Sequence, residues 1–180
     1  MEQIKELTKR LIANSFKELL MQLSFDKITI KMITDHANVI RPTFYNHFHD
    51  KYELVEWILQ DEILTKGEEL LLAGQGGEGI KTILTGFYAD KEYYRKAFDI
   101  NGQNGFGETL HNRLTDVFSK VVEAEKVKTG KVSTRLVAQY YAAGLMTVIR
   151  YILFESGDDG LTDILDMYKY LMEHTIYEIM

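Results

Sequence analysis

The chain has 180 residues, of which 46% are hydrophobic and 27% charged, and this is the composition of an ordinary soluble globular protein of one or two domains. The absence of cysteine excludes disulfides, thiolate metal sites and thiol catalysis, and it permits a reducing compartment, so we expect a cytoplasmic location. The net charge of −6 lies wholly in residues 57–180 and argues against a chain coated in nucleic acid. The neutral residues 1–56 can still direct a few cations at phosphates.

The first predicted element is an amphipathic helix over roughly residues 2–23. Its apolar residues recur at steps of three, four and five: Ile4, Leu7, Leu11, Phe16, Leu19, Leu20 and Leu23. The start "MEQIKELTKR" is charged and lacks the apolar segment of a secretory signal, so we expect none.

A short second helix follows "SFDKIT". Thr29 is a suitable N-cap, and Ile30, Ile33 and Ala37 share one face, although Met32 stands where Glu or Gln would complete a capping box. Asn38 tolerates the left-handed backbone conformation, so the helix is expected to end there in a tight turn.

The only proline of the chain, Pro42, predicts the start of a third helix, because proline is favoured in the first helical turn. This helix is expected to span about two turns, to His47 or Phe48. Asp50 is the expected N-cap of a fourth helix from Lys51 to about Leu72, with Glu53 as the second half of a capping box.

The remaining pattern is also helical, which predicts an all-α fold of about nine helices without strands. The glycine-rich stretch Ala73–Gly79 predicts a linker or sharp corner. Further helices are expected at about 80–89, 91–100, 107–127, 133–155 and 161–180, with Ser133 as a possible cap. The apolar run Leu136–Ile149 has 14 residues, so we interpret it as too short for a membrane span and expect no membrane partner.

Two short helices joined by a tight turn are typical of a helix-turn-helix, whose second helix enters the major groove. Phe44 and Phe48 are four residues apart and are expected to face the core. The outer surface then carries side chains that suit base edges and phosphates: Arg41, Thr43, Tyr45, Asn46 and His47. Lys51 opens the next helix, where a cation and free backbone N–H groups together favour a phosphate.

At these residues the sequence resembles the TetR family of bacterial transcription regulators. The resemblance covers Thr29 to Leu54 and rests on "ANV", "PTFYNHF" and "DKYEL". It implies that Thr29 contacts the DNA backbone and Lys51 grips phosphate, while the DNA-facing helix presents Pro42, Thr43, Tyr45, Asn46 and His47. Asn38 replaces the usual Gly, and Ile40 stands where a polar cap is common, which leaves the start of the helix open.

The resemblance implies a DNA-binding domain over residues 1–50 and a helical domain over 51–180 that binds an effector and dimerises through its last two helices. The expected function is a regulator that binds an inverted-repeat operator as a homodimer. The stretch "NGQNGF" resembles a subset that includes regulators of dihydroxyacetone-kinase operons, some of which work through a protein partner. A helical co-regulator that acts mainly through a protein partner is therefore the alternative.

Aromatic residues in the second domain are candidates for an effector pocket, although aromatic residues at helical spacing also build cores. The candidates are Trp57, Tyr94, Phe98, His111 and Tyr141. His47 and His49 are two residues apart and point to different helix faces, so we expect no metal site. Nothing in the sequence indicates a cofactor or a catalytic constellation, so we expect no enzyme.

Overall fold

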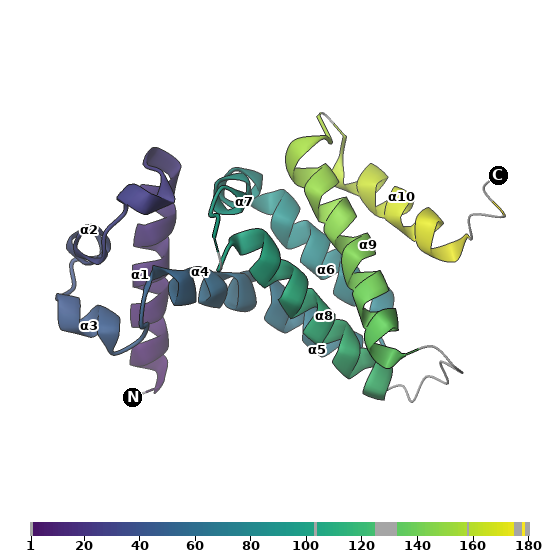
Figure 1. The fold of residues 1–180 in the computed structure, drawn as a ribbon, viewed down its shortest axis with the longest axis horizontal. Coiled ribbons are helices and arrows are strands. Elements are labelled where there is room, and N and C mark those ends of the chain that lie inside the picture. The colour runs from purple at the N-terminus through teal and green to yellow at the C-terminus, as the bar shows by residue number, and fades with distance from the viewer. Residues whose placement is uncertain (1, 103, 125–132, 158, 175–177, 179–180) are drawn as a thin grey trace. The chain divides into compact units, whose positions relative to one another are not determined.

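The structure is a computed structural model that describes residues 2–102, 104–124, 133–157, 159–174 and 178. Within these ranges every regular element is helical (Figure 1). The α-helices are α1 (Glu2–Gln22), α2 (Ile30–His36), α3 (Arg41–Tyr45), α4 (Lys51–Leu59), α5 (Thr65–Leu72), α6 (Gly76–Ala89), α7 (Lys91–Phe98), α8 (Phe106–Ala124), α9 (Thr134–Phe154) and α10 (Leu161–Glu173). A π-helical turn joins α4 to α5, so the described residues form nine helical segments besides one short 3-10 turn, as predicted.

Two compact units divide the chain. Unit 1 comprises Met1–Glu62 and Glu92–Leu110, and unit 2 comprises Ile63–Lys91 and His111–Met180. This division follows packing and not function, so the predicted functional boundary after residue 50 stays a prediction.

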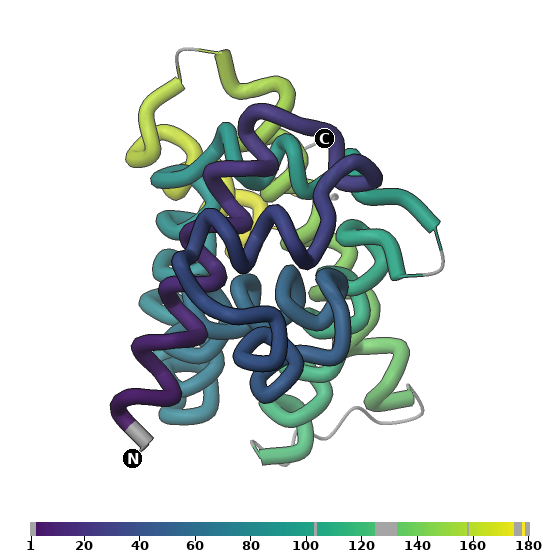
Figure 2. Tube along the Cα trace, turned by 90° about the vertical axis from the view of Figure 1, so that its left-hand side faces the viewer, coloured from purple at the N-terminus to yellow at the C-terminus, as the bar shows by residue number. Residues whose placement is uncertain are grey.

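Unit 1 is built on α1, which packs against α2 and α4, while α2 packs against α3. Figure 2 shows α2 and α3 in front with α1 running beside them. The core contains Phe16 of α1, Ile33 of α2 and Phe44 of α3, all fully buried. The first part of the predicted apolar stripe differs, because Ile4 and Leu7 are 69% and 70% exposed.

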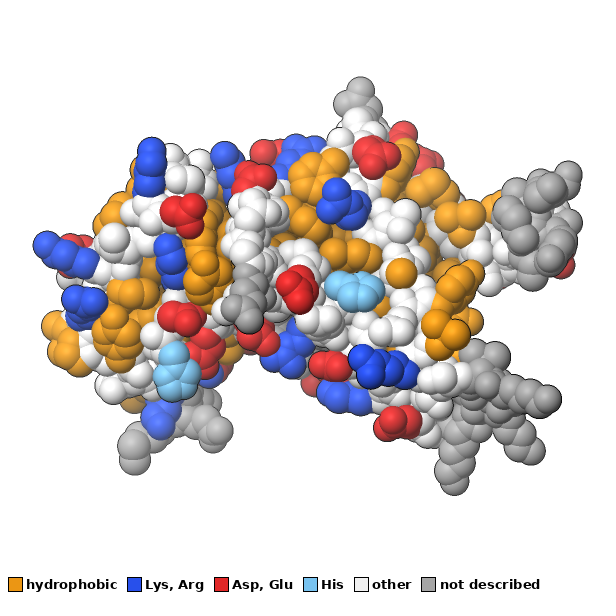
Figure 3. All heavy atoms as spheres, in the orientation of Figure 1, with side chains coloured by type: hydrophobic (Ala, Val, Ile, Leu, Met, Phe, Trp, Pro, Cys, Tyr) orange, Lys and Arg blue, Asp and Glu red, His pale blue; other side chains and the backbone are white. Residues whose placement is uncertain are grey.

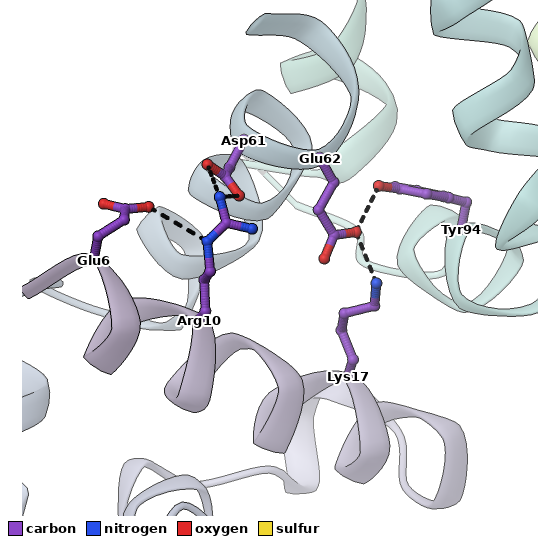
Figure 4. A network of polar contacts seen from close by, with 6 residues as sticks. All are labelled: Glu6, Arg10, Lys17, Asp61, Glu62 and Tyr94. Carbon is purple, nitrogen blue, oxygen red and sulfur yellow. Dashed lines mark hydrogen bonds and ion pairs between the residues drawn. The ribbon is translucent and has the colours of Figure 1, made fainter. Parts of the chain in front are cut away.

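The π turn Gln60–Leu64 modifies the predicted fourth helix, which is continuous to Leu72 but is not α-helical throughout. Its two consecutive acids meet bases of α1 (Figure 4). Asp61 lies 2.9 Å from Arg10, and Glu62 lies 2.7 Å from Lys17. Glu62 also accepts a hydrogen bond from the Tyr94 hydroxyl of α7. These contacts hold the end of α4 to α1 within unit 1.

The glycine-rich linker prediction was wrong for residues 76–79, which form the first turn of α6. Only Ala73–Gln75 connect α5 to α6. A Cβ atom added to Gly79 would lie 2.7 Å from Leu71 Cγ and 2.9 Å from the backbone oxygen of Gly67. The glycines therefore permit close packing of α5 and α6 instead of a flexible linker.

Helix α9 buries one face in unit 2, where Ala142, Leu145 and Ile149 are fully covered. It is 21 residues long because it continues beyond both arginines of the predicted run. The argument that this segment is too short for a membrane was therefore wrong. By length and composition alone α9 could cross a membrane, a test that core helices of soluble proteins also pass.

Candidate nucleic-acid interface

The turn between α2 and α3 has the geometry expected from the sequence. Thr29 caps α2, with its hydroxyl oxygen accepting a hydrogen bond from the backbone N–H of Met32 at 3.2 Å. Asn38 has φ 52°, in the left-handed region. The N–H of Val39 then bonds the carbonyl oxygen of Thr34 at 3.0 Å, which satisfies a carbonyl at the helix end.

Helix α3 begins at Arg41, one residue before the predicted start. Ile40 occupies the N-cap position with extended backbone and makes no side-chain cap, and it is 70% exposed. The preset φ of Pro42 in the first turn supports the helix start without a polar cap. The α-helix ends at Tyr45 with Asn46 as its C-cap, so it is shorter than the two turns predicted.

The two faces of α3 divide as expected. Phe44 and Phe48 are buried, and their ring centroids lie 5.7 Å apart. The remaining predicted DNA-facing residues are at the surface: Arg41, Pro42, Tyr45 and Asn46 are exposed, and Thr43 and His47 are half-buried. Figure 3 shows basic, acidic and apolar side chains intermixed over this part of unit 1.

Arg41 and Tyr45 interact across one turn of α3. Arg41 Nη2 donates a hydrogen bond to the Tyr45 hydroxyl at 3.2 Å, and the guanidinium carbon lies 5.7 Å from the centroid of the ring. The contact uses one of five N–H donors of Arg41, so the others remain for a base edge or phosphate.

Lys51 lies at the start of α4, where Asp50 caps the helix by accepting hydrogen bonds from the N–H groups of Tyr52 and Glu53. Lys51 Nζ donates to the backbone oxygens of Phe25 and Ile28, at 2.7 and 3.0 Å. Burial lowers the pKa of Lys51 from its usual value. An ammonium group has three N–H donors, so one remains for an outside acceptor.

His47 lies beside cations of α1. Its pKa is lowered first by burial and then by the charges of Lys9 and Lys5, and Glu6 opposes the shift. Lys9 in turn lies over Trp57, with Nζ 5.5 Å from the ring centroid. Sequence reasoning did not select Lys5 or Lys9, although their i, i+4 spacing near the chain start was a visible signal.

The five effector candidates do not form one cluster. Trp57, Tyr94 and Phe98 belong to unit 1, and His111 and Tyr141 to unit 2. Trp57 packs on Phe48, Tyr94 is fully buried, and Phe98 packs on Phe106 with ring centroids 5.1 Å apart. His111 and Tyr141 line different cavities.

Tyr141 lines an apolar cavity of about 580 Å³ within unit 2, between α6, α9 and α10. Phe118 and Tyr168 line the same cavity but were not selected from the sequence, because their spacing is that of any helix core. Burial and the nearby Tyr141 raise the pKa of Tyr168 to about 12. Its hydroxyl is neutral at physiological pH and can donate a hydrogen bond.

In the described part of the chain, no group of three or more His, Cys, Asp or Glu side chains is arranged to hold a metal ion. His36 lies against Glu18 of α1, with Nε2 3.5 Å from a carboxylate oxygen.

Comparison with protein families matches two parts of the chain. Residues 17–58 match the family described as bacterial regulatory proteins, tetR family. Residues 77–174, more than half of the chain, match a transcriptional regulator C-terminal region of the same family. The two matched regions cover the helix-turn-helix and most of unit 2.

Individual relatives agree with the family match. The HTH-type dhaKLM operon transcriptional activator DhaS of Lactococcus lactis is 25% identical over 150 residues, which cover 80% of this chain and 78% of the relative. The solved structure of a dihydroxyacetone kinase operon activator DhaS has a TM-score of 0.64 at 20% identity, covering 92% and 94% of the two chains. The expected resemblance to regulators of dihydroxyacetone-kinase operons is confirmed.

A second solved structure with the same fold is FadR of Thermus thermophilus, a TetR family repressor in complex with lauroyl-CoA. Its TM-score is 0.61 at 18% identity, and the alignment covers 93% of this chain and 94% of that one.

Proposed function

The chain belongs to the TetR family of DNA-binding transcriptional regulators, and from that premise we propose that it binds an inverted-repeat operator as a homodimer and responds to an effector. The family is non-enzymatic, in agreement with the expectation from the sequence. A bacterial transcriptional regulator binds chromosomal DNA, so we assign the protein to the cytoplasm.

The observation that carries the dimer proposal is the exposed apolar surface of α9 and α10. Leu136 and Tyr140 are 57% and 73% exposed, and Phe154 is 48% exposed. Tyr170 and Leu171 of α10 are about half exposed, at 48% and 50%. Side chains of this size at this density favour burial against a second copy.

The same helix has room for close approach of a partner. A Cβ atom added to Gly144 would meet nothing within 4 Å, and Ala143 beside it is exposed. Small residues between large apolar ones allow two helices to pack closely. Dimerisation would set the spacing of two helix-turn-helix heads, and hence the spacing of the two half-sites.

Sedimentation of Tyr140→Arg tests the dimer. We expect the wild-type chain to sediment as a dimer and the variant as a monomer with weaker operator binding. Leu7→Arg is the matched control, because Leu7 is also 70% exposed but lies on α1. A monomeric wild type, or a fully dimeric Tyr140→Arg, contradicts the proposed interface.

We place the effector in the cavity between α6, α9 and α10. Its walls include Leu165 and Met172 of α10, so an occupant would contact a proposed dimerisation helix. An effector that prefers one arrangement of α10 shifts the equilibrium between head spacings that fit and do not fit the operator. The apolar walls favour a ligand with an extended apolar part, and FadR binds such a ligand, lauroyl-CoA.

Operator binding in the presence of lauroyl-CoA tests this site, with free CoA as the control for the polar moiety. We expect lauroyl-CoA to change operator affinity and free CoA to have no effect. Leu165→Trp, which adds volume inside the cavity, should reduce the response. An unchanged operator affinity at saturating lauroyl-CoA argues against an acyl effector.

The alternative is a regulator that acts mainly through a protein partner. The relative DhaS is an operon activator, and an activator needs a productive contact with other proteins at its promoter. Transcription from the operator with purified polymerase distinguishes the two: a requirement for a further protein, with no response to small molecules, favours the alternative. Footprinting on the DNA beside its own gene identifies the operator for all of these tests.

A further inference from the structure

A hollow of about 490 Å³ lies within unit 1, between the first turns of α1 and the end of α3. Ile4, Lys5 and Thr8 line it from α1, and Asn46 and His47 line it from the segment after Tyr45. It adjoins the surface that carries Tyr45 and Asn46, but none of its α1 residues belongs to the helix-turn-helix.

Cations gather around this hollow. Lys5 lines it, and Lys9 is near enough to lower the pKa of His47 by its charge. The ring of Trp57 lies under the Lys9 ammonium at 5.5 Å and packs on Phe48, the neighbour of His47. Lys9 is thus positioned by a cation–π contact.

Without a bound anion, the positive charges around the hollow do not favour the stability of the folded protein. Lys5 lies in the first turns of α1, where the helix dipole disfavours positive charge. The nearby carboxylate, Glu6, lies 3.9 Å from Arg10, which is itself paired with Asp61. A bound anion would offset the repulsion among Lys5, Lys9 and a protonated His47.

We propose that this hollow binds a phosphate of the operator backbone, held by Lys5, Lys9 and His47, and that His47 takes up a proton when the phosphate binds. The proposal rests on the proposed function, because it assigns a second contact of the same DNA-binding head. The exposed side chain of Ile4 at the rim is suited to contact a sugar or a thymine methyl.

The charges near His47 determine whether operator binding strengthens or weakens as the pH falls. Lys9 and Lys5 of α1 disfavour its protonated form, and Glu6 of α1 favours it. Phe48, whose ring centroid lies 6.3 Å from that of His47, is uncharged. A phosphate adds negative charge, so it raises the pKa of His47 and binding should tighten as the pH falls from 8 to 6.

Salt dependence of operator binding is the first test. Each phosphate contact contributes about 0.9 to the slope of log affinity against log salt. Lys5→Gln and Lys9→Gln should each reduce the slope by up to about this amount and weaken operator and random duplex equally. Lys66→Gln, an exposed lysine of unit 2, is the matched control and should leave the slope unchanged. Unfolding of each variant, followed by the fluorescence of Trp57, the only tryptophan, verifies the fold.

Proton uptake is the second test, measured by calorimetry of operator binding in buffers of different ionisation enthalpy. The wild type should take up protons near pH 7 and His47→Gln should take up fewer. If both lysine variants keep the full salt slope, or His47→Gln takes up as many protons, the second phosphate site is refuted. A wild type that prefers operator over random duplex shows that the proposed function survives this failure, whereas loss of that preference refutes the proposed function itself.

Discussion

Lys51 Nζ lies 4.1 Å from the centroid of the Phe25 ring and donates to the backbone oxygen of the same residue at 2.7 Å. The start of α4 is thereby joined to the turn that precedes α2. Because one ammonium donor remains, Lys51 can both hold this turn and contact a phosphate. The resemblance to the family implied only the second role.

Lys51→Met should therefore destabilise the protein as well as weaken DNA binding. Two charge-assisted hydrogen bonds are lost, but the group is partly exposed, so we expect a cost of roughly 1 kcal/mol. Chemical denaturation measures this cost, with Lys66→Met as the surface control. Unchanged stability with reduced operator affinity would mean that Lys51 contributes only a phosphate contact.

Arg41 and Tyr45 should act as a coupled pair in operator binding. Arg41→Ala is expected to weaken binding by about 10- to 100-fold, because a bidentate arginine contact contributes roughly 1–3 kcal/mol. Tyr45→Phe removes the hydroxyl that orients Arg41 and should weaken binding less. The double variant should lose less than the sum of both effects in a gel-shift titration. Strict additivity would show that the contact between them has no role in binding.

Gly79→Ala and Gly76→Ala should have different effects on the stability of the folded protein. The Cβ of Gly79→Ala would lie against Leu71 and the backbone of Gly67, which costs about 1–3 kcal/mol by overpacking. The Cβ of Gly76→Ala would meet nothing within 4 Å, so this variant should be neutral or more stable by about 0.5–1 kcal/mol. Melting temperatures of the two variants measure the difference, and equal destabilisation would contradict the close packing of α5 and α6.

Stability should fall on acidification because of His47. Its pKa is lowered in the folded protein relative to the usual 6.5, so the unfolded chain binds more protons once the pH falls below about 7. The resulting loss of stability continues until the pH passes below the folded pKa. Urea unfolding at pH 7.5, 6.5 and 5.5 should show a smaller decrease for His47→Gln than for the wild type. An equal decrease in stability for the wild type and His47→Gln would mean that other groups cause the acid sensitivity.

Local signals were sufficient wherever short-range chemistry decides the backbone. The cap at Thr29, the left-handed Asn38, the cap at Asp50 and the proline-led start of α3 all depend on contacts within a few residues. The same segment carries the surface residues predicted to face DNA. Their contacts with an operator remain predictions.

Long-range packing accounts for the rest. The sequence predicted a linker at the glycines of residues 76–79, but they form the first turn of α6 and allow it to pack closely on α5. Trp57 and Tyr94 were predicted to line an effector pocket. Instead, the Trp57 ring lies under the Lys9 ammonium, and Tyr94 is buried with its hydroxyl bonded to Glu62. Lys9 and Glu62 are tens of positions from Trp57 and Tyr94 in the sequence, and Gly79 packs on Leu71 and Gly67 of the preceding helix.

By itself the sequence determined the helical elements, the caps at Thr29 and Asp50 and the helix-turn-helix, because these depend on neighbours one to four residues apart. The predicted cap at Ser133 was wrong, because Ser133 occupies the N-cap position of α9 but its side chain makes no cap hydrogen bond. Only the tertiary structure decided which lysines surround His47, what Lys51 holds and which aromatic residues line the cavity of unit 2. These features arise from side chains brought together by packing, and helical periodicity specifies a buried face without specifying its neighbour.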